Sequence, residues 1–161
     1  MSRCLSGEYE HKLDAKGRLI MPLNLRSELG ESFMVTKGID CCLYVYGMTE
    51  WEEFVEKLNK LPMTNRTARA FKRGFLAGAV KCEPDAQGRI LLSPKQREYA
   101  HIDKDVYVIG NGENVLFGGA NAGHMGNCRN VETVLDEGSQ LHRAFGTAAA
   151  CTVGYADKIR L

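Results

Sequence analysis

A short motif that pairs an aspartate with an arginine occurs twice in the chain. Its copies are Asp14-Ala15-Lys16-Gly17-Arg18 and Asp85-Ala86-Gln87-Gly88-Arg89. In this spacing the carboxylate can accept hydrogen bonds from the amides of a turn, and the glycine allows a positive φ. The arginine can reach back to the aspartate, or outward to a phosphate or the edge of a guanine. The motif therefore indicates an ion pair that locks a turn, a nucleic-acid contact, or both, because a paired arginine keeps other donors free.

The residues around each motif indicate that a whole unit is duplicated. Each copy is followed by an aliphatic run and a proline, Pro22 or Pro94, and later by a hydrophobic stretch that ends in Gly38 or Gly110. Alternating patterns on both sides of the first motif predict two strands joined by a turn, so we expect the motif at the tip of a β-hairpin. The elements predicted for the first unit are strands at 8–13, 18–21, 33–36 and 42–46 and a helix at 23–29. A unit of about 45 residues is too small to bury a good core alone, so the two copies are expected to pair.

Two helices are predicted between the copies. Thr49 resembles a capping-box threonine at the start of the first helix, and Pro62 ends that helix. The second helix is predicted over residues 64–78. It carries most of a basic run that extends from Lys57 to Lys81 without an acidic residue. Such a run either creates a local positive field that attracts phosphates or is simply the solvated face of a helix.

The composition is that of an ordinary globular chain with one or two small domains. The chain has 161 residues, of which 44% are hydrophobic and 25% charged, and its net charge is +1. No apolar run is long enough to span a membrane, and the first residues lack the apolar stretch of a signal peptide, so we expect a cytoplasmic protein. The six cysteines form no Cys-x-x-Cys pair, and the four histidines lie in no metal or nucleophile signature. We therefore expect no enzyme activity, no metal or other cofactor, and no small-molecule substrate.

The two Asp-x-x-Gly-Arg motifs occur together with a lead-in at residues 7–11 (Gly-Glu-Tyr-Glu-His) and a segment at residues 68–71 (Ala-Arg-Ala-Phe). In this combination they closely resemble the MraZ family of bacterial regulators of the division and cell-wall gene cluster. The resemblance implies a mainly β, α+β fold of two tandem swapped-hairpin units of SpoVT-AbrB type, which form a pseudo-dimeric barrel with a helical linker. It also implies a ring of several chains that binds double-stranded DNA at repeated boxes in the promoter of its own operon, usually with repression. The expected location is the cytoplasm, in association with the nucleoid.

The resemblance also implies roles for individual residues. Carried over position by position, the DNA-contacting residues of the family fall on Lys16, Arg18 and Arg89. The residues that shape the two turns are Asp14, Gly17, Asp85 and Gly88. Gln87 stands where the first copy has Lys16, so the second turn has one positive charge fewer and the two copies can be unequal on DNA.

The implied domain division has four parts. Residues 8–50 form the first SpoVT-AbrB-like domain, 51–78 the helical linker, 79–122 the second domain with an altered last strand, and 123–161 a divergent tail. Past Gly110 the family continues with a strand and tryptophans, whereas residues 111–161 contain no tryptophan. We expect the last strand of the second domain to be lost, which would leave an unpaired sheet edge, or replaced by Val115-Leu116-Phe117. We expect residues 118–161 to be mobile or loosely packed.

A frameshift is one explanation for this C-terminus. Reading the codons of residues 116–123 from their third base permits two tryptophans at the spacing of the family. A genuinely divergent tail is the alternative, and the nucleotide sequence of the gene distinguishes the two.

Two other functions fit the duplicated motif. One is a binding module of the same fold with another task, such as an AbrB-like antitoxin or a stationary-phase regulator, although these usually carry one unit per chain. The other is a structural ring without a DNA role, which would tolerate the loss of Arg18 and Arg89.

Overall fold

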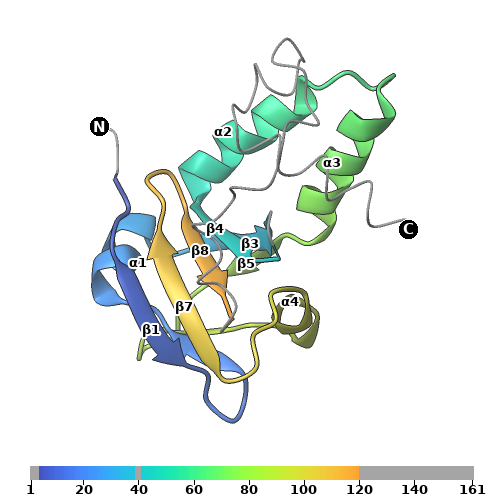
Figure 1. Cartoon of the computed structure of the whole chain (residues 1–161). Helices are drawn as coiled ribbons and strands as arrows, with labels where there is room; N and C mark the ends of the chain where they lie inside the picture. Colours follow the sequence, from blue (N-terminus) through green and yellow to red (C-terminus); the bar gives the residue numbers. More distant parts are fainter. Residues whose placement is uncertain (1–3, 39–40, 120–161) are drawn as a thin grey trace.

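The computed structural model describes residues 4–38 and 41–119 of the chain (Figure 1). Its described strands are β1 (Glu8–Lys12), β2 (Arg18–Ile20), β3 (Phe33–Lys37), β4 (Leu43–Gly47), β5 (Val80–Cys82), β6 (Arg89–Leu91), β7 (Asp105–Gly110) and β8 (Val115–Gly118). Its described helices are α1 (Leu23–Leu29), α2 (Met48–Asn59), α3 (Arg66–Ala77) and α4 (Pro94–Tyr99). The described fold is α+β and mainly β, with antiparallel strand pairs throughout.

The strands of the two copies are exchanged between two sheets. A six-stranded sheet has the order β1-β7-β8-β4-β3-β5, and a two-stranded ribbon consists of β2 and β6. The first strand of each copy pairs with the third strand of the other copy, β1 with β7 and β5 with β3. In the described residues β1 and β5 are the edges of the larger sheet, so backbone hydrogen bonds do not close it into a barrel.

The expected hairpin around the first motif is wrong in its pairing. The two strands lie where the alternation predicts them, and a turn joins them. However, β1 pairs with β7 and β2 pairs with β6, so no ladder joins β1 to β2 in the described residues. The local pattern fixes which residues are extended, but the packing of one face of each strand into a core shared with the other copy decides the pairing partner.

One hydrophobic core contains residues from both copies. Leu19 of β2 and Ile90 of β6 face each other in the ribbon and are buried together with Phe33, Val106 and Phe117 of the larger sheet. The expectation that the copies pair to build a core is therefore confirmed, because neither unit could enclose these side chains alone.

The last strand of the second unit is replaced rather than lost. β8 comprises Val115–Gly118 and pairs with β7 on one side and with β4 on the other. It lies inside the sheet, and Phe117 is fully buried. The expected unpaired edge is therefore absent at β8. Gly118 belongs to β8 and is buried, so the predicted mobility is wrong at its first residue. The rest of that prediction, from residue 120 onward, and the divergent tail lie outside the described residues. The frameshift hypothesis stays a prediction, because only the nucleotide sequence of the gene tests it.

The two helices between the copies are present, but the first one starts differently. β4 runs directly into α2, so the N-cap is Gly47, no side chain caps the helix, and Thr49 lies inside it. α3 starts at the cap Asn65, whose side chain accepts a hydrogen bond from the Ala68 amide. The hydroxyl of Thr36 in β3 donates to the carbonyl of Phe75, which ties α3 to the sheet. Among the described residues, no helix is long and apolar enough to cross a membrane.

Candidate nucleic-acid interface

The first motif forms a tight turn built around one carboxylate. Oδ1 of Asp14 accepts hydrogen bonds from the amides of Lys16 and Arg18, both at 2.9 Å, and Oδ2 accepts from Nε of Arg18 at 2.6 Å. The amide of Gly17 donates to the carbonyl of Asp14, and Gly17 has a φ of +79°. The aspartate and the glycine are therefore required by the geometry of this turn, and the arginine side chain adds one bond to it.

The second motif repeats this geometry. Asp85 accepts from the amides of Gln87 and Arg89 at 2.9 Å and from Nε of Arg89 at 2.8 Å, and Gly88 has a φ of +76°. The ion pair that locks the turn is thus present in both copies. Each arginine uses only Nε in this contact, and its other guanidinium nitrogens have no partner among the described residues. An arginine held in this way is oriented by its aspartate and still has donors free.

The hydrogen bonds of the turns lower the pKa of both carboxyl groups. For Asp14 the main cause is the backbone amide of Arg18, and for Asp85 it is the backbone amide of Arg89. The arginine side chain of each turn lowers the pKa further, and desolvation opposes the shift; at Asp14 desolvation outweighs the side-chain hydrogen bond of Arg18. Both aspartates are therefore ionised at neutral pH and hold their arginines as charged partners.

The β2–β6 ribbon brings the two arginines, far apart in sequence, onto one small sheet. Its register places Arg18 opposite Leu91 and Ile20 opposite Arg89, so the arginines lie on a diagonal of the same face. Lys16 is exposed in the first turn, just before the ribbon. All three predicted DNA-contacting residues consequently lie on the ribbon or on the turn that leads into it.

Backbone hydrogen bonds connect each turn to the residue that follows the ribbon strand of the other copy. The carbonyl of Gly88 accepts from the amide of Met21 at 3.0 Å, and the carbonyl of Gly17 accepts from the amide of Leu92 at 3.1 Å. The two turns therefore flank the ribbon at opposite ends and are held in one fixed arrangement.

Two further arginines, which the sequence reasoning did not single out, pack against the turns. Arg97 of α4 lies against Gly17, where an added Cβ would come within 3.1 Å of Cζ of Arg97, and Arg26 of α1 lies so close to Gly88 that a Cβ there would overlap its guanidinium. Nε of Arg97 is buried without a hydrogen-bond partner in the described part of the chain. Each helix thus supports the turn of the other copy. The sequence feature that could have identified them is their spacing, since Arg26 and Arg97 follow the two motifs at equivalent places.

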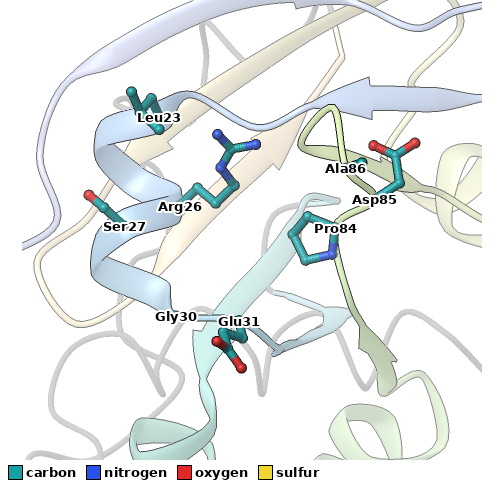
Figure 2. Close-up of a pocket in the computed structure, with 8 residues that line it drawn as sticks. All are labelled: Leu23, Arg26, Ser27, Gly30, Glu31, Pro84, Asp85 and Ala86. Carbon is teal, nitrogen blue, oxygen red and sulfur yellow. The ribbon is translucent and has the colours of Figure 1, made fainter.

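A shallow cavity lies beside the second turn. Figure 2 shows Arg26 reaching from α1 toward the loop that carries Asp85 and Ala86. The cavity has a volume of about 480 Å³ and is also lined by Leu23 and Glu31. Acidic and basic groups share the lining, so the cavity does not favour a ligand of either charge. It provides space for the Arg26 side chain to move.

Two regions of the chain match a known protein family. Residues 4–74 and 75–117 match the family model of the MraZ protein, which its description also calls antitoxin-like. The chain belongs to the MraZ family. A transcriptional regulator MraZ of Caldanaerobacter subterraneus subsp. tengcongensis is 58% identical over 106 residues, which cover 66% of this chain and 74% of that protein. A transcriptional regulator MraZ of Carboxydothermus hydrogenoformans is 54% identical over 109 residues, which cover 68% of this chain and 76% of that protein.

These matches confirm the family that the motifs of this MraZ chain predict. The two matched regions meet between residues 74 and 75, so each contains one motif. The relatives are named as transcriptional regulators, a class of protein that is not enzymatic.

Proposed function

We propose that this MraZ chain is a sequence-specific, DNA-binding transcriptional regulator that represses its own division and cell-wall operon. One observation carries the proposal. Arg18 and Arg89 occupy the same face of the β2–β6 ribbon, and each is oriented by its own aspartate with further donors free. The names of the relatives support the regulatory role.

The proposed contact between the β2–β6 ribbon and DNA follows from the dimensions of the major groove. The major groove admits a two-stranded β-ribbon, and an arginine can donate two hydrogen bonds to O6 and N7 of guanine. In this arrangement Arg18 and Arg89 read base edges, and Lys16 contacts a phosphate. Asp14 and Asp85 keep the guanidinium groups in place, so little side-chain entropy is lost on binding.

The wider architecture is part of the same proposal. We divide the chain into SpoVT-AbrB-like domains at 8–50 and 79–122, a helical linker at 51–78 and a tail at 123–161. The exchange of strands between the copies supports a swapped-hairpin, pseudo-dimeric repeating unit, in which the six-stranded sheet and the β2–β6 ribbon enclose one core. Chains arranged head to tail in a closed ring suit repeated promoter boxes, because several weak contacts then add through effective concentration. The protein acts in the cytoplasm, at the nucleoid, without a cofactor.

An antitoxin is the second candidate, since the family description calls the MraZ protein antitoxin-like. An AbrB-like antitoxin would also bind DNA, but it would form a stable complex with a toxin protein. Purification of the chain from its own cells distinguishes the two candidates: a protein partner in fixed proportion favours the antitoxin, and a complex of this chain alone favours the regulator.

A gel-shift titration tests the proposed function. The probe is the DNA upstream of the chain's own gene, and the control is a shuffled fragment of the same length and composition, each at two salt concentrations. We expect selective binding to the upstream DNA that weakens as salt rises, because phosphate contacts release counterions. Equal affinity for both fragments would reject sequence-specific regulation. Light scattering of the free protein tests the ring independently.

A further inference from the structure

The outer face of the ribbon carries two aliphatic side chains that the proposed arginine contacts do not use. Ile20 is 53% exposed and Leu91 is 60% exposed, whereas the neighbouring Leu19 and Ile90 are 0% and 2% exposed. Because side chains alternate along a strand, the exposed pair shares its face with Arg18 and Arg89. The ribbon therefore presents a polar and an apolar surface to the same partner.

The register places these four side chains at the corners of a compact rectangle. Leu91 lies opposite Arg18, and Ile20 lies opposite Arg89. Directly opposed side chains have Cβ atoms about 5 Å apart, and residues two apart on one strand are about 7 Å apart. Each aliphatic side chain is therefore the nearest neighbour of one arginine.

We propose that Ile20 and Leu91 contact the 5-methyl groups of thymines next to the guanines that Arg18 and Arg89 bind. This inference rests on the proposed function. The thymine methyl is an apolar group on the major-groove edge of the base pairs, and aliphatic side chains make contact with it. Successive bases on one strand are about 3.4 Å apart, so an aliphatic side chain about 5 Å from an arginine reaches an adjacent base pair. The boxes recognised by this chain thus pair each guanine with a neighbouring thymine.

The charge of the face favours DNA over a second copy of the chain. The two arginines carry positive charge beside both aliphatic side chains, and their aspartates already engage Nε within the same turn. Two copies joined through this face would bring together the guanidinium donors that the aspartates leave free and would offer them no acceptors. DNA supplies the opposite charge and the methyl groups at once.

Replacing thymine by uracil tests the inference without altering the protein. The upstream fragment is amplified with dUTP in place of dTTP, which removes the methyl group but keeps the hydrogen-bonding groups of the base. Affinity for each fragment is divided by affinity for the matching shuffled fragment. We expect selective binding to weaken about fourfold for each contacted thymine, from the transfer of one methyl-sized group. Equal selectivity for thymine and uracil DNA would overturn the inference.

Variants assign the effect to the two side chains. In Ile20→Ala/Leu91→Ala the thymine preference is expected to fall toward one, while binding to uracil DNA stays close to that of the wild type. Met63→Ala is the matched control, because Met63 is 69% exposed but lies between α2 and α3. It should keep the full preference.

The remaining outcomes separate the possible errors. If the wild type does not select the normal upstream DNA at all, the proposed function fails, and the inference that rests on it fails with it. If selectivity is intact but indifferent to the methyl groups, the proposed function stands and the inference fails. A smaller particle mass for Ile20→Ala/Leu91→Ala, with its thymine preference unchanged, would assign the aliphatic pair to contacts between chains and likewise overturn the inference.

Discussion

Replacing Gly88 by alanine should weaken the fold through two separable effects. The first is conformational: Gly88 has a φ of +76°, and an L-residue in the left-handed region costs about 1–2 kcal/mol. The second is a local clash, because the new Cβ would overlap the guanidinium of Arg26. The Arg26 side chain has no hydrogen-bond or ion-pair partner among the described residues and borders an open cavity, so moving it should cost about 1 kcal/mol or less.

Gly112 is the matched control for the first effect. Its φ of +78° is nearly the same, but a Cβ at Gly112 would meet nothing within 4 Å. Gly112→Ala should therefore lower the free energy of unfolding by about 1–2 kcal/mol, and Gly88→Ala by up to about 3 kcal/mol. Combining Gly88→Ala with Arg26→Ala should remove the clash and recover the difference, which appears as a coupling energy of about 0.5–1 kcal/mol.

Equilibrium unfolding in urea measures these free energies, with the fluorescence of Trp51 as the signal. Trp51 is the chain's single tryptophan, and it is largely buried. A Gly88→Ala variant as stable as the wild type would contradict the argument from φ. A coupling energy of zero between Gly88→Ala and Arg26→Ala would contradict the packing of α1 against the second turn.

Two further predictions concern the sheet and the turns. Phe117→Ala should lower the free energy of unfolding by about 3–5 kcal/mol, because Phe117 is fully buried in a strand that is paired on both sides. Urea unfolding measures this loss. A loss below about 1 kcal/mol would contradict the position of β8. The second prediction is a pH dependence. The native pKa values of Asp14 and Asp85 lie below the ordinary value of 3.8, so their ionised forms stabilise the fold above that pH, and the contribution is lost as pH falls through the native pKa. The stabilisation from the turns should therefore stay constant from pH 8 to pH 5 and decline below about pH 4. Urea titrations across this range should give a shallower acid decline for Asp14→Asn/Asp85→Asn, and an unchanged decline would contradict the assignment.

The sequence predicts most strands and helices of this fold because their signals are local. Alternation marks β1, and leucine spacing together with a following glycine marks α1. Pairing depends on contacts distant in the chain, so the pattern around Asp14 predicts a turn between two strands but also an incorrect hairpin. The predicted helix cap at Thr49 is wrong for a related reason: β4 continues directly into α2, and Gly47 is the N-cap.

The candidate site is partly visible in the sequence. The repeated motif identifies Asp14, Arg18 and their equivalents, because each turn is stabilised by residues within five positions of one another. The supporting roles of Arg26 and Arg97 could not be predicted from local patterns, since each packs against the turn of the other copy. The exposed face shared by Ile20 and Leu91 likewise depends on the pairing of β2 with β6.

The most direct test of the DNA-binding proposal compares two pairs of arginines in the gel-shift assay. Arg18→Ala/Arg89→Ala removes the two ribbon guanidiniums, and Arg66→Ala/Arg73→Ala removes the same charge from the exposed side of α3. We expect the ribbon variant to lose about 1–3 kcal/mol of binding free energy per engaged turn on upstream DNA but much less on shuffled DNA. The α3 variant should weaken binding slightly and equally on both fragments. Normal selective binding by a folded Arg18→Ala/Arg89→Ala protein would contradict the account.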